Sequence, residues 1–186
     1  MAIASKKLTL EEFLKLPEKK PALEYAEGRI TQKPLPKGKH SVLQFKVADA
    51  VNRVAVPTRL AMAFPELRFT FEGRSYVPDV SVYQRERIPR DPDGRVADDF
   101  FVPPDIAIEV LSPGQSLNAV IRRCDWYIAN DVAAALGVNP ADESVRLFLP
   151  GHEPQVLRNQ DPIDLGDLLP GFHLTVDQLF DSLKDI

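Results

Sequence analysis

Two acidic residues stand inside stretches that otherwise read as buried β-strands. Asp79 lies in SYVPDVSVYQ, directly after a proline, and Glu109 lies within the apolar run PPDIAIEVLSP. An ionised carboxylate in an apolar strand costs free energy unless a cation compensates its charge. Carboxylate oxygens suit hard divalent ions such as Mg²⁺ or Mn²⁺, which keep several waters and often bind substrate phosphate. The pair therefore predicts a shared metal ion and phosphodiester chemistry.

A second interpretation of the same two residues needs no metal. Pro78 could set Asp79 at a strand bend that faces solvent, and Glu109 could pair with an arginine. Residue spacing alone does not decide between the two interpretations.

Length and composition predict one globular domain over residues 1–186. The chain has 186 residues, and 44% of them are hydrophobic, which is enough for a proper core. No apolar run reaches the roughly 18 to 20 residues that span a bilayer, and the first ten residues do not resemble a secretory signal. The single cysteine, Cys124, excludes an intrachain disulfide. We expect a cytoplasmic protein that does not associate with membranes.

Charge is unevenly distributed along the chain. The formal net charge of −4 argues against a generally basic nucleic-acid binder, yet residues 1–60 hold twelve lysines and arginines against six acids. Such an asymmetry could mark a surface that faces phosphate, or it could be an ordinary solvated face.

The periodicity of apolar residues predicts the elements that must position the two acids. Thr9 and Glu12 form a capping-box pattern for a short helix that ends before Pro17. The long segment 85–104 is rich in charge, proline and glycine and reads as a loop. The other expected elements are a hairpin over 22–35, a helix over 40–56, an antiparallel pair of strands over 60–73 and 74–84, a central strand over 105–112, a helix over 116–131, two strands over 132–140 and 144–150, and a last helix from about Val176. The expected packing face of the first long helix is Val42, Phe45, Val47 or Ala48, Val51 and Val54.

Several of these motifs, in this order, resemble a known family. YVPDVSVY followed by PDIAIEVLSP, a helix that ends in a tyrosine, and VAAALGVNP followed by SVRLF are similar to the Uma-two (Uma2) family of putative restriction endonucleases, a branch of the PD-(D/E)XK nuclease superfamily. LTLEEFLKLP, LEYAEGRI and DLLPGFHLTVDQLF extend the similarity over nearly the whole chain. The resemblance implies an α/β (α+β) fold with a restriction-endonuclease-like mixed central sheet flanked by helices, in a single domain.

The resemblance also implies roles for individual residues. Asp79 and Glu109 would bind the metal, with the backbone carbonyl of Val110 as a third ligand. Glu24 matches a hairpin carboxylate that could complete the metal shell, and His40 matches a histidine at a helix start that could contact phosphate or water. Without the resemblance, His40 would be read as an ordinary surface histidine.

The chain departs from the family pattern at positions that bear on catalysis. The superfamily lysine two residues after the glutamate is Leu111 here, and the family lysine on the next helix is Arg123. Arginine can neutralise charge at the scissile phosphate but is effectively never deprotonated, so it cannot shuttle a proton. The aspartate expected in the same helix is Ala119.

Two hypotheses from different classes therefore remain at the level of sequence. The first is an endonuclease that uses Mg²⁺ or Mn²⁺ to hydrolyse nucleic acid, with DNA as the expected substrate, and that could act as a homodimer. In it Asp79, Glu109, Arg123, Glu24 and His40 form the catalytic set. The alternative is a weakened or inactive nuclease-fold module that binds nucleic acid or protein.

Overall fold

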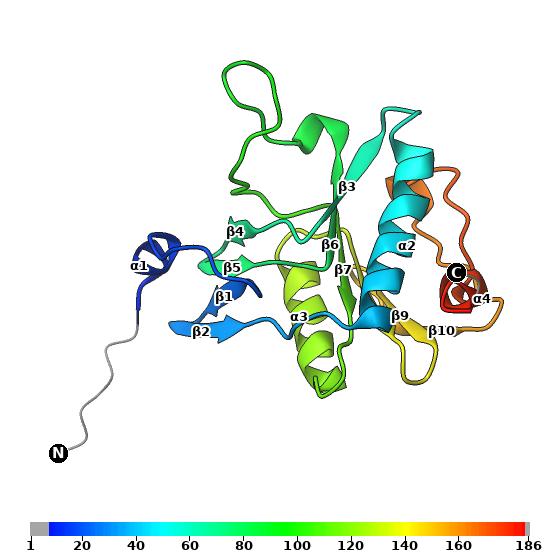
Figure 1. The fold of residues 1–186 in the computed structure, drawn as a ribbon. Helices are drawn as coiled ribbons and strands as arrows, with labels where there is room; N and C mark the ends of the chain where they lie inside the picture. Colours follow the sequence, from blue (N-terminus) through cyan, green and yellow to red (C-terminus); the bar gives the residue numbers. More distant parts are fainter. Residues whose placement is uncertain (1–7, 185–186) are drawn as a thin grey trace.

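The computed structural model describes residues 8–184, which fold into two β-sheets and four α-helices (Figure 1). The helices are α1 (Leu10–Leu14), α2 (Gly38–Ala55), α3 (Leu117–Ala129) and α4 (Val176–Asp181), and short 3₁₀ turns span Arg85–Arg87 and Gly166–Leu168. At α1, Thr9 and Glu12 form the expected capping box, in which each side chain binds the backbone N–H of the other residue.

The large sheet is mixed and has the strand order β10-β9-β8-β7-β6-β3. Its strands are β3 (Ala61–Pro65), β6 (Val80–Gln84), β7 (Ile106–Val110), β8 (Ala134–Asn139), β9 (Ser144–Phe148) and β10 (Gln155–Arg158). β7 and β8 run parallel, and α3 connects them, whereas every other neighbouring pair is antiparallel. β7 is thus a central strand, as the apolar run around Glu109 predicts.

The small sheet is antiparallel and has the order β2-β1-β5-β4. Its strands are β1 (Leu23–Ala26), β2 (Arg29–Gln32), β4 (Phe69–Phe71) and β5 (Arg74–Tyr76). Two-residue loops close both of its hairpins, with φ of 54° and 77° at Glu27 and Gly28 and φ of 43° and 72° at Glu72 and Gly73. Positive φ at both loop residues is the type I′ geometry that matches the twist of paired strands, and glycine adopts it without strain.

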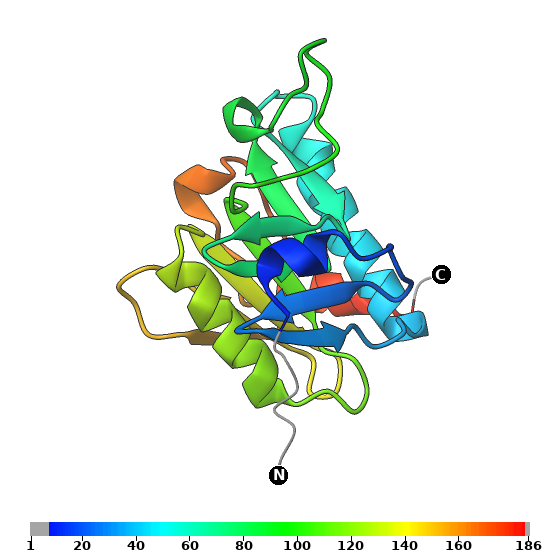
Figure 2. The same cartoon turned by 90° about the vertical axis from the view of Figure 1, so that its left-hand side faces the viewer.

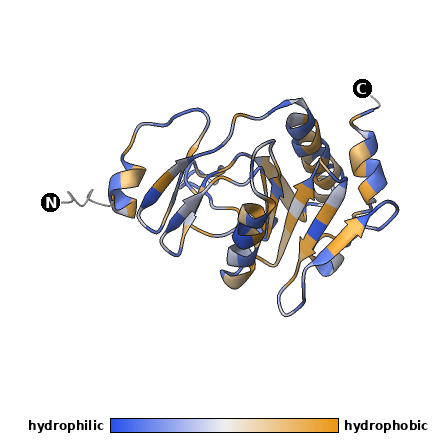
Figure 3. Ribbon diagram, turned by 90° about the horizontal axis from the view of Figure 1, so that it is seen from below, coloured by the Kyte–Doolittle hydropathy of each residue, from blue (hydrophilic) through white to orange (hydrophobic). Residues whose placement is uncertain are grey.

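Helices cover the large sheet on both faces, and Figure 2 shows α2 and α3 on its opposite sides. Along β7 the side chains alternate, so that Ile106, Ile108 and Val110 pack with α2 and α4, whereas Ala107 packs with α3. Glu109 therefore faces the α3 side. The strands of the large sheet are mostly hydrophobic, and the helices carry both kinds of residue (Figure 3).

The chain passes from the small sheet to the large one through Val77, Pro78 and Asp79, between β5 and β6. Because Val80 pairs with Ile108 in the antiparallel register of β6 and β7, Asp79 comes opposite Glu109 at the end of these strands. Two opposed residues of an antiparallel pair share a sheet face. The fold thus sets the two acids side by side.

Three expectations about the elements were wrong. The segments 60–73 and 74–84 each divide into two strands that belong to different sheets, so the expected single pair is four strands. β10 was not expected. The buried face of α2 contains Leu43 rather than Val42, and Phe45 is 70% exposed, because the helix begins at Gly38 and its packing on the sheet selects a neighbouring stripe.

Among residues 8–184, no helix is long and apolar enough to cross a membrane.

The corrected face of α2 can be tested by stability. Leu43 is fully buried, so Leu43→Ala should lower the free energy of unfolding by about 2–5 kcal/mol through lost packing. Phe45→Ala should change it by less than about 0.5 kcal/mol because that ring lies largely in solvent. Urea denaturation of both variants measures the difference, and equal losses would show that the helix packs through the other stripe.

Candidate active site

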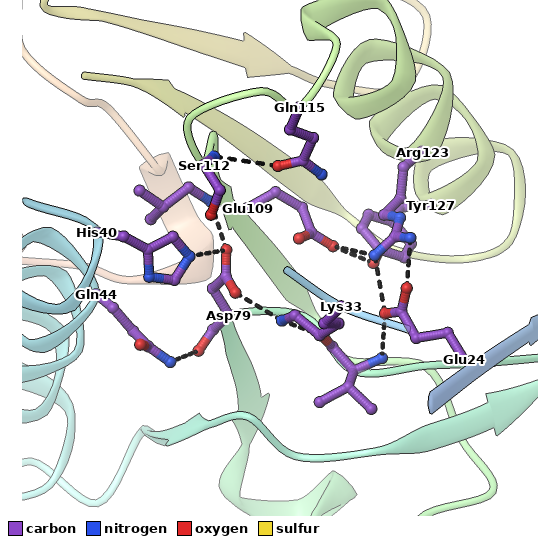
Figure 4. A network of polar contacts seen from close by, with 12 residues as sticks. Glu24, Lys33, His40, Gln44, Asp79, Glu109, Ser112, Gln115, Arg123 and Tyr127 are labelled. Carbon is purple, nitrogen blue, oxygen red and sulfur yellow. Dashed lines mark hydrogen bonds and ion pairs between the residues drawn. The ribbon is translucent and has the colours of Figure 1, made fainter. Parts of the chain in front are cut away.

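A cavity of about 260 Å³ opens where the two sheets meet. Its walls come from the β1–β2 hairpin, the start of α2, the β5–β6 connection, the end of β7 and α3. The charged and titratable residues that line it are Glu24, Lys33, His40, Glu66, Asp79, Glu109 and Arg123. Figure 4 shows Asp79 and Glu109 reaching toward the same space, with His40 on one side and Arg123 and Tyr127 on the other.

Asp79 is buried, and three groups bind its carboxylate. Oδ1 lies 2.6 Å from Lys33 Nζ, and Oδ2 accepts the Val110 N–H at 2.7 Å and lies 3.1 Å from His40 Nε2. Burial raises the pKa of Asp79, but the hydrogen bond with His40 and the charge of Lys33 outweigh burial and hold that pKa below its ordinary value. Asp79 is therefore a carboxylate at neutral pH.

Lys33 was not expected in the site. Its Nζ donates to the Val77 carbonyl at 2.7 Å as well as to Asp79, and its side chain is only 10% exposed. Burial lowers its pKa, but the charges of Asp79 and Glu109 outweigh burial and raise the pKa of Lys33 above its usual range. Lys33 thus carries a positive charge at neutral pH.

Glu109 is held from the α3 side. Its Oε1 accepts the Tyr127 hydroxyl at 2.6 Å and lies 3.4 Å from Arg123 Nη1. Oε2 makes no hydrogen bond with any residue that the structure describes. Burial raises the pKa of Glu109; the charge of Arg123 opposes this shift, and the charge of Asp79 adds to it. The pKa of Glu109 is thus raised above its ordinary value, in contrast to the lowered pKa of Asp79.

Glu24 and Arg123 form a bidentate ion pair. Arg123 Nη1 and Nη2 donate to Glu24 Oε1 and Oε2 at 2.9 and 2.6 Å, and Glu24 Oε1 also accepts the Val77 N–H at 3.0 Å. The guanidinium lies 4.6 Å from the centre of the Tyr76 ring, a distance suited to a cation–π contact. This pair joins α3 to β1 and, through the Val77 N–H, to the segment that follows β5.

The structure brings all the residues of the expected site together. Asp79, Glu109, Val110, Glu24 and Arg123 line one cavity, although the metal-binding and catalytic roles assigned to them stay predictions. His40 also lines it and is buried, so the reading of a surface histidine was wrong. The solvent-facing bend expected for Asp79 in the metal-free interpretation was wrong as well, whereas its Glu109–arginine pair is present.

The donor atoms fit a divalent ion only in part. Asp79 and Glu109 offer hard oxygen donors side by side, and Glu109 Oε2 is free to bind. Both oxygens of Glu24, in contrast, bind Arg123. Within residues 8–184, no group of three or more histidine, cysteine or acidic side chains is arranged to hold a metal ion. An ion placed here would have two carboxylates as ligands, and waters or substrate would have to supply the others.

The ion pair of Glu24 and Arg123 can be measured by a double-mutant cycle. Arg123→Ala leaves buried Glu24 without its partner and should lower the free energy of unfolding by about 3 kcal/mol. In the Glu24→Gln background the same change should cost much less, because no buried charge is left alone. Additive losses in chemical denaturation would mean that the two side chains do not interact.

The lowered pKa of Asp79 predicts how stability depends on pH. A depressed carboxyl pKa adds stability above the unfolded value, near 4, and that stability is lost as pH falls through the folded pKa. The advantage of the wild type over Asp79→Asn should thus be largest above about pH 4 and shrink below it. Urea titrations at several pH values test this, and an advantage that grows in acid would contradict the assigned charge state.

Comparison with known proteins gives a consistent result. A family model, Uma2, described as "Putative restriction endonuclease", matches residues 10–177. A solved structure, the crystal structure of a putative nuclease belonging to DUF820 from Anabaena variabilis ATCC 29413, is similar with a TM-score of 0.92 and 40% sequence identity, over 95% of this chain and 99% of that one. A search of the curated proteins found no match.

Proposed function

The chain belongs to the Uma2 family of putative restriction endonucleases, and we propose that it is a metal-dependent endonuclease that hydrolyses phosphodiester bonds in DNA. The observation that carries the proposal is a pair of buried acids, Asp79 directly before β6 and Glu109 on the adjacent strand β7, in one cavity with two cations. Two buried acids in a core are hard to explain by stability alone, since apolar residues of similar size would cost less free energy.

Asp79 and Glu109 would hold Mg²⁺ or Mn²⁺, and Glu109 Oε2 is the oxygen that no residue among 8–184 already binds. When bound, the ion would lower the pKa of a water and stabilise the leaving oxygen. Lys33 would have to release Asp79 Oδ1 for that carboxylate to bind an ion through the same atom.

The two cations of the site would stabilise charge rather than move protons. Arg123 stays charged at all relevant pH values, and the raised pKa of Lys33 keeps its ammonium protonated near neutrality. Both border the cavity in which the phosphate would lie, so they can neutralise the negative charge that develops on it. Neither replaces the proton-shuttling lysine of the family pattern.

Polar groups around the acids hold the site in place. Gln44 donates to the Asp79 carbonyl at 2.8 Å, and Gln115 accepts the Ser112 N–H at 3.1 Å in the loop after β7. His40 Nδ1 is buried without a hydrogen-bond partner in the described part of the chain. We propose that this atom accepts a hydrogen bond from a water or, when the ring carries a proton on both nitrogens, donates one to a phosphate oxygen of the substrate. Cleavage of both DNA strands would need two such sites, and pairing of two chains stays a prediction.

A second function is favoured by the saturated state of Asp79. Both of its oxygens are bound by Lys33, His40 and the Val110 N–H, so this carboxylate is compensated without a metal. Together with an arginine where the family has a lysine, this supports a nuclease-fold module that binds nucleic acid without cutting it.

Cleavage of plasmid DNA separates the two functions. With Mg²⁺ or Mn²⁺ present, the wild type should nick supercoiled DNA, and Asp79→Asn and Glu109→Gln should each slow nicking by more than about 10²-fold, the upper range for residues that only orient a ligand. Asp142→Asn is the matched control because Asp142 is an acid paired with Arg158 outside the cavity. Nicking that survives in Asp79→Asn would overturn the assigned site.

A further inference from the structure

A second cavity, of about 570 Å³, adjoins the candidate active site. Thr31 and Arg123 line both cavities, so Arg123 is part of the wall between them. The β1–β2 hairpin, β5 and α3 build this second space, which we call the arginine pocket and define by Arg29, Arg74, Tyr76, Arg122, Arg123 and Trp126. Apart from Arg123, the proposed function assigns no role to its residues.

The charge of the arginine pocket is suited to a polyanion. Four arginines line it against two acids, Glu27 and Asp125, in a chain whose net charge is −4. Glu27 forms an ion pair with Arg74. The side chains of Arg29 and Arg122 are exposed and make no ion pair or hydrogen bond within residues 8–184. These two guanidinium groups are therefore available to phosphate oxygens.

The aromatic part of the pocket is suited to a nucleoside. Arg74 lies 4.9 Å from the centre of the Trp126 ring and 5.9 Å from that of Tyr76, and it donates to the Tyr76 hydroxyl at 2.9 Å. Trp126 and Tyr76 meet edge to face, with ring centres 5.2 Å apart. Single-stranded nucleic acids bind proteins through such combinations of arginine and aromatic side chains, which stack on bases, beside cations that contact the backbone.

We propose that a single strand of nucleic acid passes from the candidate active site into the arginine pocket. A phosphate next to the scissile one binds Arg29 and Arg122, and its nucleoside contacts Arg74 and Trp126. This inference rests on the nucleic-acid substrate of the proposed function, but it does not need cleavage.

Trp126 makes the pocket directly observable, because it is the only tryptophan in the chain. A short single-stranded DNA oligonucleotide is titrated into the protein in a buffer that contains EDTA. The fluorescence of Trp126 should change with each addition until the binding site is saturated. Arg29→Ala and Arg122→Ala should each weaken binding about tenfold at low salt, as loss of a charge-assisted hydrogen bond does. Each should also reduce the slope of log K against log salt by about 0.7.

Arg59→Ala is the matched control. Arg59 is exposed and follows the C-terminal end of α2, whereas His40 near the N-terminal end lines the active site. A helix of 18 residues is about 27 Å long, so Arg59 lies far from the bound strand. Its affinity should equal that of the wild type. Equal affinity in all three arginine variants, or binding without a fluorescence change, would overturn the proposal. Displacement of the oligonucleotide by inorganic phosphate at constant ionic strength would also overturn it, since the pocket would then bind any anion.

Asp79→Asn distinguishes failure of the pocket from failure of the proposed function. The variant should lose nicking and keep the fluorescence change with its dependence on Arg29 and Arg122. If the wild type shows that fluorescence change but never nicks DNA, the pocket stands and the endonuclease falls. If the wild type nicks DNA and the arginine variants bind normally, the endonuclease stands and the pocket falls.

Discussion

The compensation of three buried carboxylates is the constraint on which the rest of the structure depends. Glu24, Asp79 and Glu109 are each no more than 3% exposed, and each would be costly without a partner. Their charged partners come from the residue after β2 and from α2 and α3. Satisfying the charges therefore requires both sheets and both large helices to meet at one point. The site and the junction of the two sheets are therefore the same piece of structure.

This arrangement explains why a charged cluster persists where an apolar core would be more stable. Lys33 and Arg123 offset part of the negative charge, and the Val110 and Val77 N–H groups and the Tyr127 hydroxyl satisfy individual oxygens. The three acids still outnumber the two cations, and Glu109 Oε2 is left without a hydrogen bond among the described residues. A site of this kind can bind a further cation or a ligand that donates hydrogen bonds. The match to the Uma2 family of putative restriction endonucleases supports nuclease chemistry for it.

The parts of this structure that follow local rules could be predicted from the sequence. The strand after Pro78 and the apolar run around Glu109 predicted two strands that each carry one acid, and the family resemblance implied that these acids and Arg123 share one site. Lys33 could not be found this way, because a lysine after a hairpin is usually solvated. Its burial results from the return of the chain at Val77 and Asp79, which is a tertiary contact without a local signal. The division of residues 60–84 between two sheets was missed for the same reason.

Isothermal titration of Mn²⁺ into the purified protein tests the central claim most directly, because it asks whether the acid pair is a metal site without assuming a substrate. The account predicts one ion per chain in the wild type and no detectable binding in Asp79→Asn. Equal binding in both proteins would place the ion elsewhere. An absence of binding in the wild type would mean that Lys33, Arg123 and His40 alone compensate the carboxylates. That result would contradict the account and favour the module that binds nucleic acid without cutting it.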